Sequence, residues 1–213
     1  MTHIFDVDNT VIKRTSAWYF LQDALNEKIV EFSQVSRLVI DLIKYKLARP
    51  DNDFIDNVVK NLAGIKKTEL ERISKICFEK RIKANIYSEI KEIIKNALQK
   101  GDRVIFATSS FDFIVCPLEK FLGIEGSLAT KMEYKDGLTT GLLSGESLFG
   151  IKKKEAAKIW LEQNSIDPKD ACFYSDSYID IPLLEYCGTA IAVNPDRLLK
   201  KEARKRGWKI IKC

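Results

Sequence analysis

The sequence predicts an α/β protein: a parallel sheet with helices on both faces, and a helical insertion after the first strand. After Gly101, short apolar runs alternate with helical stretches, which is the order typical of a parallel sheet. Before Gly101 the chain contains one glycine, Gly64, and one proline, Pro50, and this composition favours long helices. A chain of 213 residues is long enough to bury such a core.

The predicted strands are short apolar runs, and the first of them covers residues 3–8. The next clear strand is 103–110, so residues 14–90 form the insertion. The later strands are expected at 171–176, 189–193 and 208–211, with helices at 111–123, 152–165, 181–187 and 195–207. Between them, alternation around Asp136-Gly137 predicts a β-hairpin.

The insertion and the segment after it carry helix signals. Phe32, Val35 and Val39 repeat at helical spacing. Thr68 and Glu71 form a capping box, which predicts that a helix starts at Thr68. Residues 88–102 predict a further helix that ends at its glycine.

The composition is that of an ordinary globular protein, with 46% hydrophobic and 31% charged residues and a formal charge of +5. We attribute this charge, and the basic run 200–212, to solvated surface rather than to a nucleic-acid or lipid site. No run is long enough to span a membrane, and the N-terminus enters a strand directly, so no leader is expected. Five cysteines without C-x-x-C spacing predict reduced thiols and a cytoplasmic location. The single histidine, His3, excludes hydrolases that need a histidine base in a triad.

Polar residues gather where three predicted strands end. They are Asp6 and Asp8 after the first strand, Thr108 and Ser109 after the second, and Asp176 and Asp180 after the third. Ligands of open parallel sheets bind outside the carboxyl ends of the strands, so these side chains are expected to share one site. The alternatives are a simple strand end at Asp6 and Asp8, and a helix cap formed by Asp176 and Asp180.

The chemistry expected of these residues is phosphoryl transfer. Asp6 and Asp8, two positions apart in a strand, face the same side and repel each other unless a cation lies between them. Oxygen ligands of this kind suit Mg²⁺, with Asp176 as a third contributor. With the metal on one carboxylate, the other can act as general acid and base, and an aspartate can form an acyl phosphate.

The chain resembles the haloacid dehalogenase superfamily of phosphatases through four motifs that occur in order. They are "DVDNT", "FATSSFD", the lysines of "GIKKKEAAKIW", and "YSDSYIDIPLLE". The insertion, "MEYKDGLTTG" and the C-terminal segment resemble subfamily IB, which includes phosphoserine phosphatase. The resemblance implies a Rossmann-like core of residues 1–13 and 91–213, with a helical cap of the C1 type at residues 14–90.

The resemblance also implies a role for each matching residue. Asp6 is the nucleophile and a Mg²⁺ ligand, and Asp8 is the acid and base, with its backbone carbonyl on the metal. Thr108 and Lys153 bind the transferring phosphoryl group, with Lys152 and Lys154 as alternatives to Lys153. Asp176 is the metal carboxylate. The supporting residues are Asp180, Asn9, Thr10 and Ser109.

Two positions depart from the family pattern. Thr15 stands where phosphoserine phosphatases carry a glutamate that handles the substrate amine, which argues against phosphoserine as the substrate. Ile179 precedes Asp180 where relatives often have asparagine.

The sequence therefore predicts a Mg²⁺-dependent phosphomonoesterase that acts on a small phosphorylated metabolite through a phospho-aspartate on Asp6. A phosphotransferase and a non-catalytic phosphate-binding module on the same fold are the alternatives. We expect no nucleic-acid partner and no membrane span, and the sequence does not indicate an oligomeric state.

Overall fold

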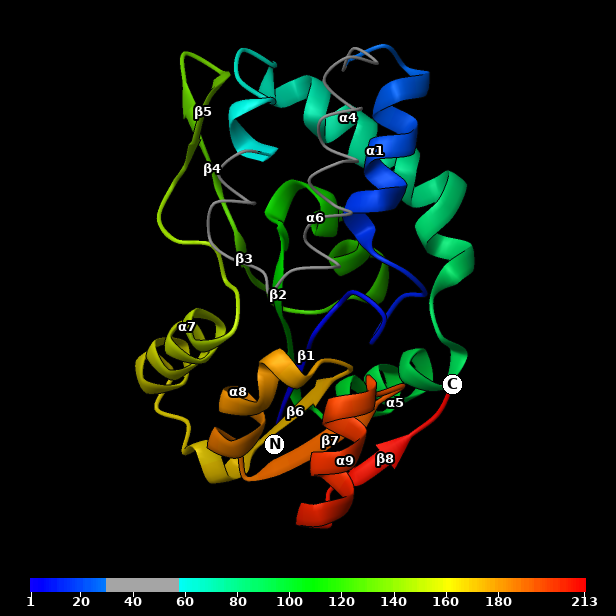
Figure 1. Ribbon diagram of the computed structural model, residues 1–213, viewed down its shortest axis with the longest axis vertical. Helices are drawn as coiled ribbons and strands as arrows, with labels where there is room; N and C mark the ends of the chain where they lie inside the picture. Colours follow the sequence, from blue (N-terminus) through cyan, green and yellow to red (C-terminus); the bar gives the residue numbers. More distant parts are fainter. Residues whose placement is uncertain (30–57) are drawn as a thin grey trace.

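The computed structural model describes residues 1–29 and 58–213, and its centre is a six-stranded sheet (Figure 1). The strands stand in the order β3-β2-β1-β6-β7-β8, and every neighbouring pair is parallel. They are β1 (Thr2–Phe5), β2 (Arg103–Phe111), β3 (Gly126–Thr130), β6 (Ala171–Ser175), β7 (Thr189–Val193) and β8 (Lys209–Ile211).

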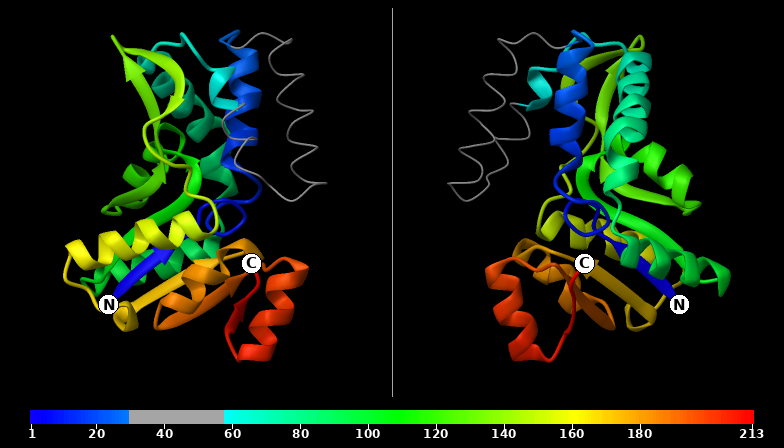
Figure 2. Two further views of the ribbon diagram at one scale, coloured as in Figure 1. Left: turned by 60° about the vertical axis from the view of Figure 1, so that its left-hand side comes forward. Right: turned by 90° about the vertical axis from the view of Figure 1, so that its right-hand side faces the viewer.

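Helices cover both faces of the sheet, and the alternation of side chains along each strand divides the core in two (Figures 1 and 2). In β1, Ile4 belongs to one core and Phe5 to the other. The Ile4 side is covered by α7 (Ile151–Gln163), α8 (Ile181–Tyr186) and α9 (Arg197–Arg206), and the Phe5 side by α5 (Ser88–Gln99) and α6 (Asp112–Leu122). The predicted fold class is confirmed.

The strand order reverses beside β1. From β1 the chain adds β2 and β3 on one side, and then crosses to add β6, β7 and β8 on the other. The carboxyl ends of β1 and β6 therefore diverge into loops at a topological switch point, where open α/β sheets bind their ligands.

A second layer lies beyond the carboxyl ends of the strands (Figure 1). It contains α1 (Ser16–Asn26), α4 (Lys67–Cys77), the π-helix η1 (Phe78–Ile82) and the 3₁₀ turn η2 (Lys83–Asn85). The antiparallel hairpin of β4 (Met132–Lys135) and β5 (Leu138–Leu143) joins this layer, because Thr139 exchanges backbone hydrogen bonds with Gly64 and Ile65. We call this layer the lid.

The two connections between lid and sheet run side by side. The Lys13 N–H donates to the Asn85 carbonyl at 2.8 Å, and the Tyr87 N–H donates to the Val11 carbonyl at 2.9 Å. The Lys13 ammonium also lies 5.7 Å from the centre of the Tyr87 ring. The chain thus leaves and re-enters the core through one short, paired ribbon.

The predicted hairpin is confirmed, and its turn residues explain it. Asp136 and Gly137 both have positive φ, +51° and +76°, which is the requirement of a type I′ turn. The capping box is wrong, because α4 begins at Lys67, one residue before Thr68. The Lys67 N–H donates to the Gly137 carbonyl at 2.9 Å, so the hairpin rather than a side chain satisfies the start of this helix.

Other elements differ from expectation in extent. The first strand ends at Phe5 rather than at residue 8, and β3 was not predicted. The boundary between residues 90 and 91 falls inside α5, which contacts β2. The two-domain division stays a prediction, and the periodic residues Phe32, Val35 and Val39 lie outside the described residues.

Candidate active site

Asp6 is the first residue after β1, and it is held from both its backbone and its side chain. Its N–H donates to the Tyr174 carbonyl of β6 at 2.9 Å, which continues the ladder one step past the strand. Its side chain is buried, and Oδ1 accepts a hydrogen bond from Nζ of Lys153 at 2.8 Å. The switch point therefore presents a carboxylate in a fixed orientation.

A tight turn follows Asp6, and it replaces the strand expected there. The Val7 carbonyl accepts hydrogen bonds from the N–H groups of Thr10, Val11 and Ile12, at 2.9–3.3 Å. Asn9 adopts a φ of +57°, a left-handed conformation that asparagine tolerates. Strand alternation therefore does not place Asp8, and the correction matters because this turn directs Asp8 toward the lid.

Asp8 receives hydrogen bonds on both carboxylate oxygens. Oδ1 accepts from the backbone N–H of Ser16 at 2.8 Å, and Oδ2 accepts from the hydroxyl of Ser110 at 3.0 Å. Burial raises the pKa of Asp8, and the bonds from Ser16 and Ser110 oppose that rise. Neither serine was singled out by sequence analysis.

Lys153 is the lysine that reaches the carboxylates. Its Nζ lies 2.8 Å from Asp6 Oδ1 and 2.8 Å from Asp180 Oδ2, and the side chain is 5% exposed. Burial alone would lower the pKa of Lys153, but the charges of Asp180 and Asp6 outweigh it and raise the pKa. The group is therefore a permanent cation at neutral pH.

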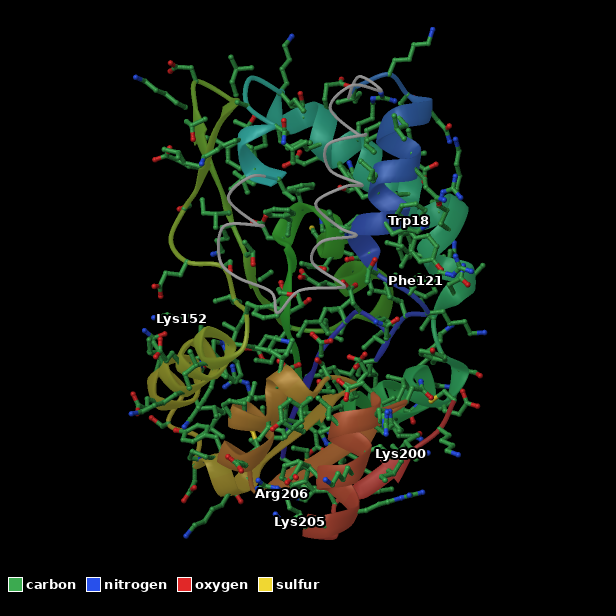
Figure 3. All side chains as sticks on the ribbon, viewed as in Figure 1. Trp18, Phe121, Lys152, Lys200, Lys205 and Arg206 are labelled. Carbon is green, nitrogen blue, oxygen red and sulfur yellow. The ribbon has the colours of Figure 1, made fainter. Side chains whose placement is uncertain are left out.

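The two neighbouring lysines point elsewhere. Lys152 pairs with Glu146 and Glu155, both at 3.0 Å, and lies on the outer side of α7 (Figure 3). The Lys154 ammonium lies 5.4 Å from the centre of the Tyr186 ring. In the structure, only the middle lysine of the three is directed into the cluster of aspartates.

Asp180 anchors Lys153 from the loop after β6. Its Oδ2 accepts from Lys153 and from the hydroxyl of Ser175 at 2.7 Å, and the side chain is buried. Ile179 makes an apolar contact instead: a side chain added at Gly150, the residue before α7, would meet it at 3.4 Å. Ser175, a third serine that sequence analysis missed, thus supports the anchor.

Asp176 approaches Asp6 from β6. Its Oδ1 accepts from the Thr10 hydroxyl at 3.4 Å, a long hydrogen bond. Burial raises the pKa of Asp176 to about 8, with Asp6 as the next cause. Burial likewise raises the pKa of Asp6 to about 7, against the opposing charge of Lys153. The cluster holds more negative charge than its one ammonium balances.

The second predicted motif divides into two roles. The Thr108 hydroxyl oxygen accepts from the Ser110 N–H at 3.1 Å, which leaves its own proton available as a donor. The Ser109 carbonyl accepts from the Thr130 hydroxyl at 2.8 Å. The printed contact of Ser109 is therefore a backbone contact to β3, whereas Thr108 and Ser110 face the aspartates.

Comparison with known proteins identifies the chain. Residues 4–185 match the family of haloacid dehalogenase-like hydrolases. The chain belongs to this family. Among curated relatives it is 32% identical over 211 residues to a phosphoserine phosphatase from Mycobacterium tuberculosis, covering 97% of this chain and 68% of that one. It is 30% identical over 226 residues to a histidinol-phosphatase from Neisseria meningitidis, covering 98% and 96%.

Solved structures of haloacid dehalogenase-like hydrolases have the same fold. A substrate-bound phosphoserine phosphatase superposes with a TM-score of 0.71 at 22% identity, covering 99% of this chain and 91% of that one. A Bordetella pertussis protein of unknown function superposes with a TM-score of 0.88 at 25% identity, covering 99% and 97%. The chain is thus an enzyme of the phosphatase type within this family. Among the described residues, no helix combines the length and apolarity needed to cross a membrane.

Phosphatases of the haloacid dehalogenase family generally use Mg²⁺, and the residues present here fit that ion. Within the described residues no three His, Cys, Asp or Glu side chains form a ready cluster. The expected ligands are fewer: the carboxylates of Asp6 and Asp176 and the backbone carbonyl of Asp8, completed by water. The raised pKa values of Asp6 and Asp176 reflect unbalanced negative charge, which a divalent cation would offset.

Proposed function

We propose that this chain is a Mg²⁺-dependent phosphomonoesterase that hydrolyses a small phosphorylated metabolite through a phospho-aspartate on Asp6. The observation that carries the proposal is the pairing of Asp6 Oδ1 with Nζ of Lys153 at the topological switch point. It fixes one oxygen of the carboxylate beside a permanent cation, and the other oxygen is assigned to attack on phosphorus.

In the first step, Asp6 attacks the phosphorus atom and the bond from phosphorus to the ester oxygen breaks. Asp8 gives its proton to that oxygen, so that the alcohol leaves neutral. Lys153 and the hydroxyl of Thr108 bind the phosphoryl oxygens as charge develops on them. Bound Mg²⁺ would supply further charge neutralisation, held by Asp6, Asp176 and the Asp8 carbonyl.

In the second step, Asp8 takes a proton from water, and the water oxygen attacks the phosphorus of the phospho-aspartate. The bond from phosphorus to the Asp6 oxygen breaks, which releases inorganic phosphate and restores the carboxylate. The raised pKa of Asp8 suits a group that must both give and take a proton near neutral pH.

The substrate class follows from the relatives and from the lid. Phosphoserine and histidinol phosphate, named in the two relatives, are both phosphate esters of primary alcohols on small amino compounds. Thr15, the residue before α1, is neutral where a phosphoserine phosphatase is expected to carry a glutamate. We therefore assign this chain a small primary alkyl phosphate other than phosphoserine.

The test is phosphate release by the purified chain, stripped with EDTA and resupplied with Mg²⁺, across a panel of alkyl and aryl phosphates. Asp6→Asn should lower kcat by at least roughly 10³-fold, because it removes the nucleophile without changing its shape. Asp170→Asn, at an exposed aspartate, is the matched control and should keep full activity. Absence of turnover across the panel, or full turnover by Asp6→Asn, would contradict the proposal.

A further inference from the structure

The Asp8 carboxylate closes a small ring of hydrogen bonds with two serines. Ser16 donates its N–H to Oδ1 at 2.8 Å, Ser110 donates its hydroxyl to Oδ2 at 3.0 Å, and the two serine hydroxyl oxygens are 2.6 Å apart. Ser16 is 1% exposed and Ser110 is 6% exposed, so water does not compete freely for these bonds.

The direction of each hydrogen bond follows from the number of protons. The single hydroxyl proton of Ser110 is directed at Asp8, so the bond between the serines must use the proton of Ser16. Ser16 thus contacts the carboxylate twice, directly through its N–H and indirectly through Ser110. Both acceptor oxygens of Asp8 are engaged without a cationic partner.

The ring joins the sheet to the lid. Ser110 lies near the end of β2, two residues after Thr108, whereas Ser16 is the first residue of α1. Thr15, at the position before α1, gives no side-chain hydrogen bond to the start of that helix. Asp8 takes this place, and its carboxylate accepts an N–H group that the helix leaves unpaired.

We propose that Ser110 and Ser16 are positioning residues that hold the Asp8 carboxylate in the orientation needed for proton transfer to the leaving alcohol. This inference rests on the proposed function. A carboxylate on a short side chain rotates unless both oxygens are fixed, and proton transfer requires the donor within hydrogen-bond reach of the ester oxygen. Loss of the Ser110 hydroxyl frees Oδ2 and also breaks the indirect link from Ser16.

The leaving group separates positioning of Asp8 from a general effect on folding. Benzyl phosphate releases an alkoxide, which depends on protonation, whereas 4-nitrophenyl phosphate releases a stabilised anion that does not. The value of kcat/KM covers the steps up to cleavage of the ester bond, so it reports this dependence even when a later step limits kcat. A residue that positions Asp8 should therefore matter for the benzyl ester and hardly at all for the nitrophenyl ester.

The experiment measures kcat/KM for 4-nitrophenyl, phenyl and benzyl phosphate in the full chain with Mg²⁺. Ser110→Ala should lower the value for benzyl phosphate by roughly 10- to 100-fold, a part of what general acid catalysis supplies, and that for 4-nitrophenyl phosphate by less than about 3-fold. Ser110→Thr, which keeps the hydroxyl, should restore benzyl phosphate to within about 3-fold of wild type. Ser16→Ala keeps its N–H bond and should give a smaller, selective loss.

The control variants make failure interpretable. Ser74→Ala removes another buried hydroxyl, which donates to the Leu70 carbonyl at 2.8 Å in α4, and should leave all three esters unchanged. Asp8→Asn should show the largest selectivity for the nitrophenyl ester. If it does and Ser110→Ala slows all three esters equally or none, the positioning role is overturned. If wild type hydrolyses no ester, or Asp8→Asn shows no selectivity, the proposed function itself fails.

Discussion

Lys153 shows how a single residue depends on its position within a run of three identical side chains. One residue earlier or later on α7, the ammonium lies against glutamates or an aromatic ring. At position 153 the helix turn directs it between Asp6 and Asp180. The difference arises because successive side chains on a helix point about 100° apart, so only one of three neighbours can face a given site.

Replacing Lys153 with alanine should abolish activity and destabilise the protein by about 3 kcal/mol, because it leaves two buried carboxylates without their partner. Lys152→Ala and Lys154→Ala are matched controls, and both should keep activity and stability close to wild type. Urea denaturation and phosphate release measure the two effects. Similar losses in all three variants would contradict the assignment of Lys153.

The residue-scale site was predictable where a motif has a fixed spacing, and not elsewhere. The structure brings together Asp6, Asp8, Thr108, Lys153 and Asp176, although the roles given to them remain proposals. Ser16, Ser110 and Ser175 escaped prediction because a serine has no pattern of its own. Ser110 is 102 residues from Asp8, and only the folded chain brings the two together.

At the scale of elements, α9 is tied to the loop that carries Asp176 and Asp180. The carboxylate of Asp196 accepts from the Leu199 N–H at 2.7 Å, which caps α9, and from the Tyr178 N–H at 2.8 Å. Its own N–H donates to the Asp176 carbonyl at 2.8 Å. A helix cap therefore also fixes the loop that follows β6.

Asp196→Ala should lower the free energy of unfolding by about 1–2 kcal/mol, because it removes a cap and a second backbone acceptor. Asp196→Asn should retain most of that stability. The control is Asp167→Ala, since Asp167 caps only the short turn η3 (Pro168–Asp170), and it should cost less than half as much. Urea denaturation checks the ranking, and equal losses for Asp196→Ala and Asp167→Ala would contradict it.

Elements with strong local signals were predicted, and elements defined by their neighbours were not. Gly137 and Gly101 announced a hairpin turn and a helix end, and both have the expected positive φ. The edge strand β3 (Gly126–Thr130) is only partly buried and contains Ser127 and Thr130, so it lacks the apolar run that marked the other strands. The start of α4 was misplaced because a hairpin distant in sequence supplies its hydrogen bond.

At the scale of the whole molecule, charge crowding at one edge of the sheet couples stability to pH. The folded pKa values of Asp6 and Asp176, about 7 and about 8, lie above the unfolded value of 3.8. The folded state therefore keeps protons that the unfolded chain releases, so this stability is present below pH 4 and is lost as pH rises toward 8. Burial lowers the pKa of His3, and its opposite contribution is confined to pH below about 6.5.

Metal-free protein should therefore lose stability between pH 6.5 and pH 8, with Tm falling by roughly 5 °C. Mg²⁺ replaces the protons, so it should raise Tm more at pH 8 than at pH 6. Thermal denaturation in EDTA and in excess Mg²⁺ measures both effects. Asp176→Asn is the control and should weaken the pH dependence. A metal-free Tm that rises over this range would refute the prediction.

The paired ribbon formed by residues 11–13 and 85–87 bears on how such a chain can change over time. Because its two strands are hydrogen-bonded neighbours, everything between them begins and ends at nearly the same point in space. The length and sequence of that excursion place little mechanical demand on the sheet. The excursion can therefore be exchanged like a cassette, acquiring a new ligand preference while the reaction centre beneath it keeps its geometry.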